Sequence, residues 1–69
     1  MKANLVLALL LLVGVVDKIE DDVALVEYEK NGGLQYSYVS LSQSACLPTE
    51  GQKVYFFEGY KIVTCEDPE

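Results

Sequence analysis

Two cysteines, Cys46 and Cys65, are the residues of this chain whose chemistry is easiest to define. In a small exported domain an even number of cysteines is typical of a disulfide. A bond between them would close a loop with 18 intervening residues, and would contribute roughly 3 kcal/mol through the reduced entropy of the unfolded chain. In a reducing compartment the same residues would be small apolar side chains. No C-x-x-C motif or neighbouring basic residue indicates a redox-active thiol.

The residues needed for most enzyme mechanisms are missing, because the chain has no histidine, arginine or tryptophan. No Ser-His or Cys-His pair can form, and the cysteine spacing fits no zinc site. The only cluster of carboxylates is Asp17, Glu20, Asp21 and Asp22. Its spacing matches no EF-hand calcium loop, and so short a chain hardly provides the cleft of a glycoside hydrolase. We therefore expect a solvated turn, with no catalytic residue, metal or cofactor.

An aromatic group near the C-terminus is a stronger candidate for function. Side chains alternate between the faces of a strand, so Tyr55 and Phe57 share one face while Phe56 lies on the other. Exposed aromatic residues beside carboxylates are typical of protein-binding surfaces. The candidate protein-binding residues are Tyr55, Phe57, Tyr60, Glu27 and Glu29. The alternative is that all of the aromatic side chains fill a small core.

The charge balance narrows the class of partner. The 69 residues contain five lysines against eleven carboxylates, a net charge of −6. Nucleic acids and anionic lipid headgroups are repelled by such a surface, since both are bound by Lys and Arg. A protein partner is therefore expected, and no nucleic acid.

The N-terminus begins with an uninterrupted apolar run from Leu5 to Val16, preceded by Lys2. This layout predicts a secretory signal peptide or a membrane anchor over residues 1–14. The run lacks an A-x-A-like cleavage site, and a helix over residues 3–16 would span roughly 21 Å, less than the roughly 30 Å of a bilayer core. Either form would place the globular part outside the cytoplasm. The alternative is burial of the run in a fold or oligomer, with the protein in the cytoplasm or in an assembly.

Apolar and polar residues alternate along much of the remaining chain. This pattern predicts short strands at residues 15–19, 23–29, 34–41, 54–57 and 60–65. The dipeptides Asn31-Gly32 and Gly32-Gly33 predict a tight hairpin turn over residues 30–33, because Asn and Gly tolerate positive φ angles. Across that hairpin, Tyr28 and Tyr36 are expected to form a cross-strand pair.

Five short strands joined by turns predict an all-β domain at residues 15–65. We expect a small five-stranded antiparallel meander or an SH3-like or OB-like barrel, whose closure would protect the sheet edges. An apolar, helical N-terminal segment would precede it. An acidic tail would follow at residues 66–69.

Two segments carry a resemblance to a known group of proteins. The first segment runs from Val16 to Glu27 and begins Val16-Asp17-Lys18-Ile19-Glu20. The second is Leu47-Pro48-Thr49-Glu50-Gly51-Gln52-Lys53-Val54. Together they resemble short, uncharacterised bacterial β-barrel domains, in which a hairpin like the first segment precedes a turn like the second. The resemblance covers about half of the chain and implies a small barrel, without an activity.

These observations predict that the chain is a non-enzymatic β domain, exported or tethered to a membrane, that binds another protein. Its size and composition suit a bacterial or phage accessory protein. The alternative is a structural subunit whose apolar N-terminal segment packs in a homo-oligomer or a larger, viral assembly. A third hypothesis is an inhibitor whose acidic surface mimics nucleic acid, which predicts salt-sensitive binding to a basic protein.

Overall fold

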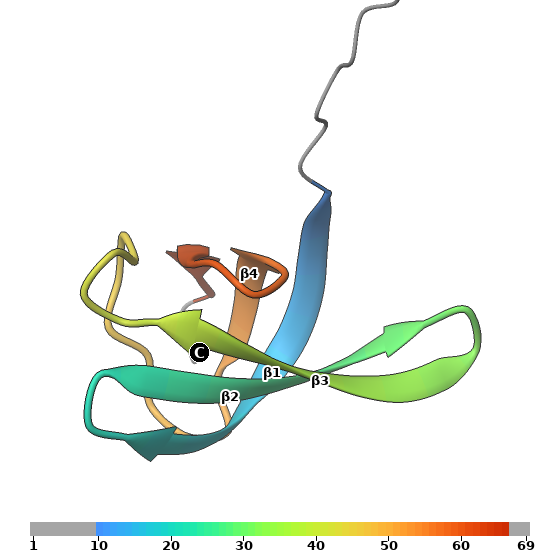
Figure 1. The fold of residues 1–69 in the computed structure, drawn as a ribbon, viewed down its shortest axis with the longest axis horizontal. Helices are drawn as coiled ribbons and strands as arrows, with labels where there is room; N and C mark the ends of the chain where they lie inside the picture. The colour runs from blue at the N-terminus through green and yellow to red at the C-terminus, as the bar shows by residue number, and fades with distance from the viewer. Residues whose placement is uncertain (1–9, 67–69) are drawn as a thin grey trace, which may run out of the picture.

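The computed structural model describes residues 10–66, which form a single five-stranded sheet (Figure 1). Its strands are β1 (Leu11–Glu20), β2 (Val23–Lys30), β3 (Gly33–Ser40), β4 (Lys53–Phe57) and β5 (Ile62–Cys65). Every pair of neighbouring strands is antiparallel, which confirms the predicted all-β, five-stranded antiparallel fold. Among residues 10–66, no helix is long and apolar enough to cross a membrane.

The predicted N-terminal segment and acidic tail fall largely outside the described residues, which exclude 1–9 and 67–69. The last part of that segment is described. Leu11, Leu12, Val13 and Gly14 are extended rather than helical, and they pair with β4 at the start of β1.

Strand β1 lies in the centre of the sheet, in the order β3-β2-β1-β4-β5. The predicted meander order is therefore wrong, because a meander would place β4 next to β3. Strand β1 has 10 residues and pairs with β2 along one edge and with β4 along the other. The long loop at 41–52 carries the chain from one edge of the sheet to the far side of β1.

Two local features allow β1 to pair on both sides. The register with β2 shifts between Val16 and Lys18, as expected for a β-bulge, and Ile19 again packs against the core beyond it. Gly14 lies opposite Tyr28 and Val54. A Cβ atom there would lie 2.6 Å from the Glu27 carbonyl oxygen, so only glycine permits this close approach of strands.

The β2–β3 hairpin has the predicted turn but a different register. Asn31 and Gly32 have φ angles of 54° and 81°, and the turn closes with Lys30 opposite Gly33. This confirms the tight turn predicted over residues 30–33, and its two central residues are Asn31 and Gly32. The closing pair places Tyr28 opposite Gln35, so the predicted Tyr28–Tyr36 pair is wrong by one residue. A shift of one residue reverses which face a side chain occupies.

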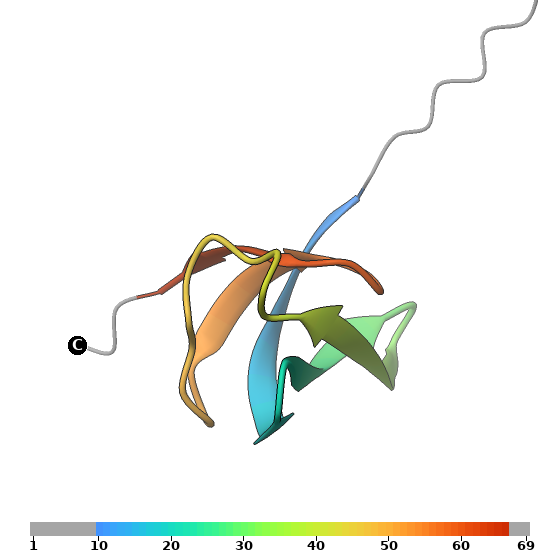
Figure 2. The same cartoon turned by 60° about the vertical axis from the view of Figure 1, so that its left-hand side comes forward.

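The strands curl around a common interior (Figure 2). Its buried side chains are aliphatic and aromatic and come from every strand and from the start of the loop: Val16, Ala24, Val26, Tyr28, Val39, Leu41, Val54, Phe56 and Ile62. Phe56 is fully buried, while Tyr55 and Phe57 are half-buried on the opposite face. The predicted alternation of these three aromatic residues is confirmed.

The sheet does not close into a barrel. Its two ends meet at one parallel bridge between Ser40 and Lys61, where the Ser40 N–H donates to the Tyr60 carbonyl oxygen at 2.8 Å. Among the described residues, β3 and β5 are otherwise not paired with each other. The closed barrel predicted from the sequence is therefore not formed, and two sheet edges persist.

Loop 41–52 covers the edge formed by β5. The Ala45 N–H donates to the Ile62 carbonyl oxygen at 2.9 Å, and the Ile62 N–H donates to Ser44 Oγ at 2.8 Å. Cys46 and Cys65 form a disulfide that joins the loop to the end of β5, as predicted. A disulfide is consistent with an oxidising, extracellular setting.

Candidate protein-binding surface

One face of the sheet points away from the core, and we call it the outer face. Residues directly opposite each other in neighbouring strands share a face, so the strand registers define its members. They are Leu11, Val13, Val15, Leu25, Glu27, Glu29, Leu34, Tyr36, Tyr38, Tyr55 and Phe57, together with Lys18, Glu20, Val23, Ser40, Lys53 and Thr64. Most of these side chains are apolar or aromatic, although the face points to solvent.

The outer face is most exposed along β3. Leu34, Tyr36 and Tyr38 follow one another on this face, and they are 62%, 56% and 67% exposed. On β1, Val13 and Val15 are also exposed. Exposed apolar side chains are ordinary when scattered singly, but a contiguous group of them indicates an interaction site.

The structure brings four of the five predicted protein-binding residues onto this face. Tyr55 and Phe57 of β4 lie opposite Val13 and Leu11 of β1, while Glu27 and Glu29 lie on β2. The fifth residue, Tyr60, lies in the β4–β5 turn. Its ring stacks on Phe57 with centroids 6.4 Å apart, and the Lys61 ammonium lies 5.1 Å from the Tyr60 centroid.

Both lysines of the outer face lie near a carboxylate, but two of its glutamates lie near no lysine of residues 10–66. Lys18 is 3.6 Å from a carboxylate oxygen of Glu20, and Lys53 is 3.6 Å from one of Glu66. Within residues 10–66, no lysine forms an ion pair with Glu27 or Glu29. Glu27 is nevertheless half-buried. The unbalanced charge of this face is therefore negative and lies on β2, beside the exposed stripe of β3.

An open depression lies where the first half of β1 separates from the β2–β3 hairpin. Its volume is about 540 Å³, and it is lined by Val13, Gly14, Val15, Glu27, Tyr28, Glu29, Leu34 and Lys53. Apolar side chains and two unpaired carboxylates thus meet in one concave region. The arrangement can hold apolar and basic groups of a partner.

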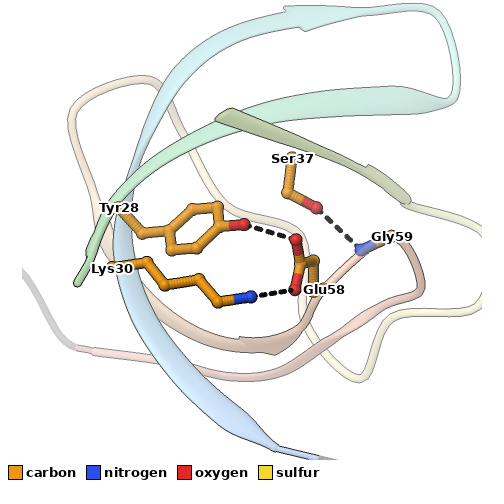
Figure 3. Close-up of polar contacts among 5 residues, drawn as sticks. All are labelled: Tyr28, Lys30, Ser37, Glu58 and Gly59. Carbon is orange, nitrogen blue, oxygen red and sulfur yellow. Dashed lines mark hydrogen bonds and ion pairs between the residues drawn. The ribbon is translucent and has the colours of Figure 1, made fainter. Parts of the chain in front are cut away.

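A separate polar cluster links the hairpin to the β4–β5 turn (Figure 3). The Tyr28 hydroxyl donates to Glu58 Oε2 at 2.6 Å, and Lys30 Nζ lies 3.4 Å from Glu58 Oε1. The Gly59 N–H donates to Ser37 Oγ at 2.7 Å. The two residues of β2 and Ser37 of β3 all point toward the turn, so these bonds join the ends of the sheet where backbone pairing is absent.

The same contacts shift two pKa values in opposite directions. The hydrogen bond to Glu58 raises the pKa of Tyr28, with burial and the nearby negative charge adding to the shift. The hydrogen bond from Tyr28 lowers the pKa of Glu58, and Lys30 lowers it further. Each partner therefore favours the form that maintains the bond, as a structural link requires.

Among residues 10–66, no group of three or more carboxylate, histidine or cysteine side chains is arranged to hold a metal ion. The predicted acidic turn is split by the β1 bulge and the β1–β2 turn, and Asp21 adopts a positive φ of 54° there. Both cysteines are joined to each other.

The sequence did not identify Leu34, Tyr36 and Tyr38 as candidate binding residues. Alternation placed them on one face, but nothing local shows which face is covered. The structure buries Ser37 instead, because its hydroxyl accepts the Gly59 N–H. The one available signal was the absence of any charged residue from Gly33 to Ser40.

No protein-family model matches this chain. No curated protein and no solved structure matches it either.

Proposed function

We propose that this chain is a non-enzymatic β domain, exported or tethered to a membrane, that binds another protein through its outer face. The observation that carries the proposal is the run of exposed Leu34, Tyr36 and Tyr38 beside two carboxylates. These carboxylates, on Glu27 and Glu29, form no ion pair with a lysine of residues 10–66. Aromatic residues that are rigid, amphipathic and exposed are favoured at protein interfaces. A solvent-facing sheet with no partner would have little need of them.

The disulfide supports the location outside the cytoplasm. Loop 41–52 is attached to β5 by Cys46 and Cys65, and such bonds persist in oxidising compartments. The part of the apolar run that precedes β1, from Leu5 to Leu10, supplies the signal or anchor. A signal peptide would release the domain, whereas an anchor would hold the outer face close to a membrane surface.

The alternative of a structural subunit is favoured by a different observation. Leu10 and Leu11 continue the apolar run, and both are exposed at the start of β1. In this case the run packs against copies of itself in a larger assembly. Removal of residues 1–9 would then abolish assembly, whereas a binding domain would be unaffected as a soluble monomer.

Site-specific photocrosslinking tests the proposed function. A benzophenone amino acid replaces Tyr38 on the outer face or, as a control, Leu47, which is 78% exposed in loop 41–52. We expect a discrete crosslinked product from position 38 in cells that produce the chain naturally, and its loss when Val15→Lys is added. Equal crosslinking from both positions, or none from position 38, would refute outer-face binding.

A further inference from the structure

Strand β3 offers a binding edge as well as an exposed face. A two-residue hairpin turn closes with a hydrogen-bonded pair, which here is Lys30 with Gly33. Hydrogen-bonded and non-hydrogen-bonded pairs alternate along antiparallel strands. Gly33, Gln35, Ser37 and Val39 therefore direct their backbone groups toward β2. Leu34, Tyr36, Tyr38 and Ser40 direct theirs away from it.

One contact confirms this alternation directly. The Ser40 N–H, which the register directs away from β2, donates to the Tyr60 carbonyl oxygen. From Ser40 toward the hairpin turn, the backbone of β3 pairs with β2, and the β2–β3 hairpin extends away from the other strands (Figure 1). The outward backbone groups from Leu34 to Tyr38 thus form an open edge, beside the exposed side chains of the same residues.

Edge strands are commonly protected against pairing by charges, proline or a bulge. Strand β3 contains no charged residue and no proline, and its register with β2 runs without a shift over all eight residues. An uncharged, regular edge of this kind is suited to adding another strand, as in β-strand addition to exposed sheet edges.

The negative charges of Glu27 and Glu29 indicate which kind of strand could add to β3. Tyr36 lies between the open edge and Glu27, and Leu34 lies between the edge and Glu29. A strand added to β3 would stand two strand spacings, about 9.6 Å, from β2. A lysine or arginine on its outer side could cross the Tyr36 ring, a favourable cation–π position, and reach these carboxylates. The open β3 edge of a second copy would bring no such cation, because β3 contains no charged residue.

We propose that β3 binds an extended segment of a partner protein by strand addition, and that this segment alternates basic and apolar residues. The proposal rests on the proposed function and names its partner class. Backbone hydrogen bonds to Leu34, Tyr36 and Tyr38 supply affinity. The carboxylates of Glu27 and Glu29 select basic side chains.

The test uses ¹⁵N-labelled protein and a blocked synthetic peptide of alternating lysine and valine. We expect the amide signals of Leu34, Tyr36 and Tyr38 to shift on titration and to gain protection from hydrogen exchange. A peptide methylated on alternate backbone nitrogens, and a peptide with glutamate in place of lysine, should leave those signals unchanged. Binding of either control peptide as strongly as the first would overturn the proposal.

Protein variants separate the backbone from the charge contribution. Tyr36→Pro removes one outward N–H and should weaken binding, and the methylated peptide gives the same information if this variant fails to fold. Glu27→Gln and Glu29→Gln should each weaken binding roughly two- to fivefold, the value of an exposed ion pair. Glu20→Gln is the matched control, because Glu20 already pairs with Lys18.

Two further outcomes would overturn the proposal. Peptide binding that leaves the three amides unchanged would place the segment elsewhere. Concentration-dependent protection of these amides in the free protein would show that a second copy occupies the edge. If crosslinking from position 38 persists in either case, strand addition by a basic segment fails while outer-face protein binding stands. If crosslinking is absent as well, the proposed function fails with it.

Discussion

The two edge strands of this sheet differ in how far their free edges are covered by other parts of the chain. Strand β5 has four residues, and loop 41–52 covers it with the Ala45–Ile62 hydrogen bond and the Cys46–Cys65 disulfide. Strand β3 has eight residues and directs Leu34, Tyr36 and Tyr38 to solvent. A small domain must protect sheet edges from unwanted pairing. One edge is protected and the other is exposed, and the exposed edge is the one to which we assign binding.

The largest expected effect is on the covered edge. Replacement of both Cys46 and Cys65 by alanine should lower the free energy of unfolding by about 2–5 kcal/mol, as for disulfides of other small domains. The loss should appear in chemical denaturation at equilibrium. Addition of a reductant to the unmodified protein is the matched control and should give a similar loss. An unchanged midpoint would show that the covered edge does not depend on the disulfide.

A smaller loss is expected at the hydroxyl that joins the loop to β5. Ser44 Oγ donates to the Ser40 carbonyl oxygen at 2.6 Å and accepts the Ile62 N–H at 2.8 Å. Ser44→Ala leaves a buried-strand N–H without its acceptor, so we expect destabilisation by about 1–3 kcal/mol. Ser42→Ala is the control, because its only side-chain contact within residues 10–66 is exposed. Equal midpoints for the two variants in urea would refute this role of Ser44.

The hydrogen bond from Tyr28 to Glu58 joins the β2–β3 hairpin to the β4–β5 turn, and its contribution to the free energy of unfolding should depend on pH. The folded-state pKa of Glu58 lies below its usual 4.5, so its contribution is present above that value and is lost as the pH falls through the folded pKa. The folded-state pKa of Tyr28 lies above its usual 10.0, so its contribution is present below that value and is lost as the pH rises through the folded pKa. Tyr28→Phe should flatten both limbs of a plot of unfolding free energy against pH. Parallel profiles for the variant and the unmodified protein would contradict the link.

The smallest effect on stability is expected at the open edge. Tyr36→Lys places a charge on an exposed side chain that contributes little to the core, so the free energy of unfolding should change by no more than about 0.5 kcal/mol. Chemical denaturation of the variant and the unmodified protein at equilibrium measures this difference. A large loss of stability would mean that the Tyr36 ring is needed for folding.

Local features of the sequence predicted local features of the structure. The Asn31-Gly32 turn follows from backbone freedom, and the separation of Phe56 from Tyr55 and Phe57 follows from strand alternation. The disulfide follows from an even cysteine count in a small domain. Each of these depends on residues close together in the chain or on composition alone.

The properties that depend on distant residues were not predictable in the same way. The central position of β1 results from its pairing with β4, some forty residues away along the chain. The inward side of β3 is fixed by the Lys30–Gly33 closing pair and by the contact of Ser37 with Gly59. Alternation alone cannot distinguish the two faces. For this reason the most exposed stripe of the candidate surface was missed.

Hydrogen exchange of the free protein, measured for each amide of β3 by NMR, tests the central claim most directly. Tyr36 and its outward neighbours Leu34 and Tyr38 should exchange rapidly, while Gln35 and Ser37, which face β2, should be protected. A pattern that alternates along a single strand cannot arise from general fraying of the hairpin. Protection at every position from Leu34 to Tyr38 would show that the edge is already paired, and would contradict an open binding edge.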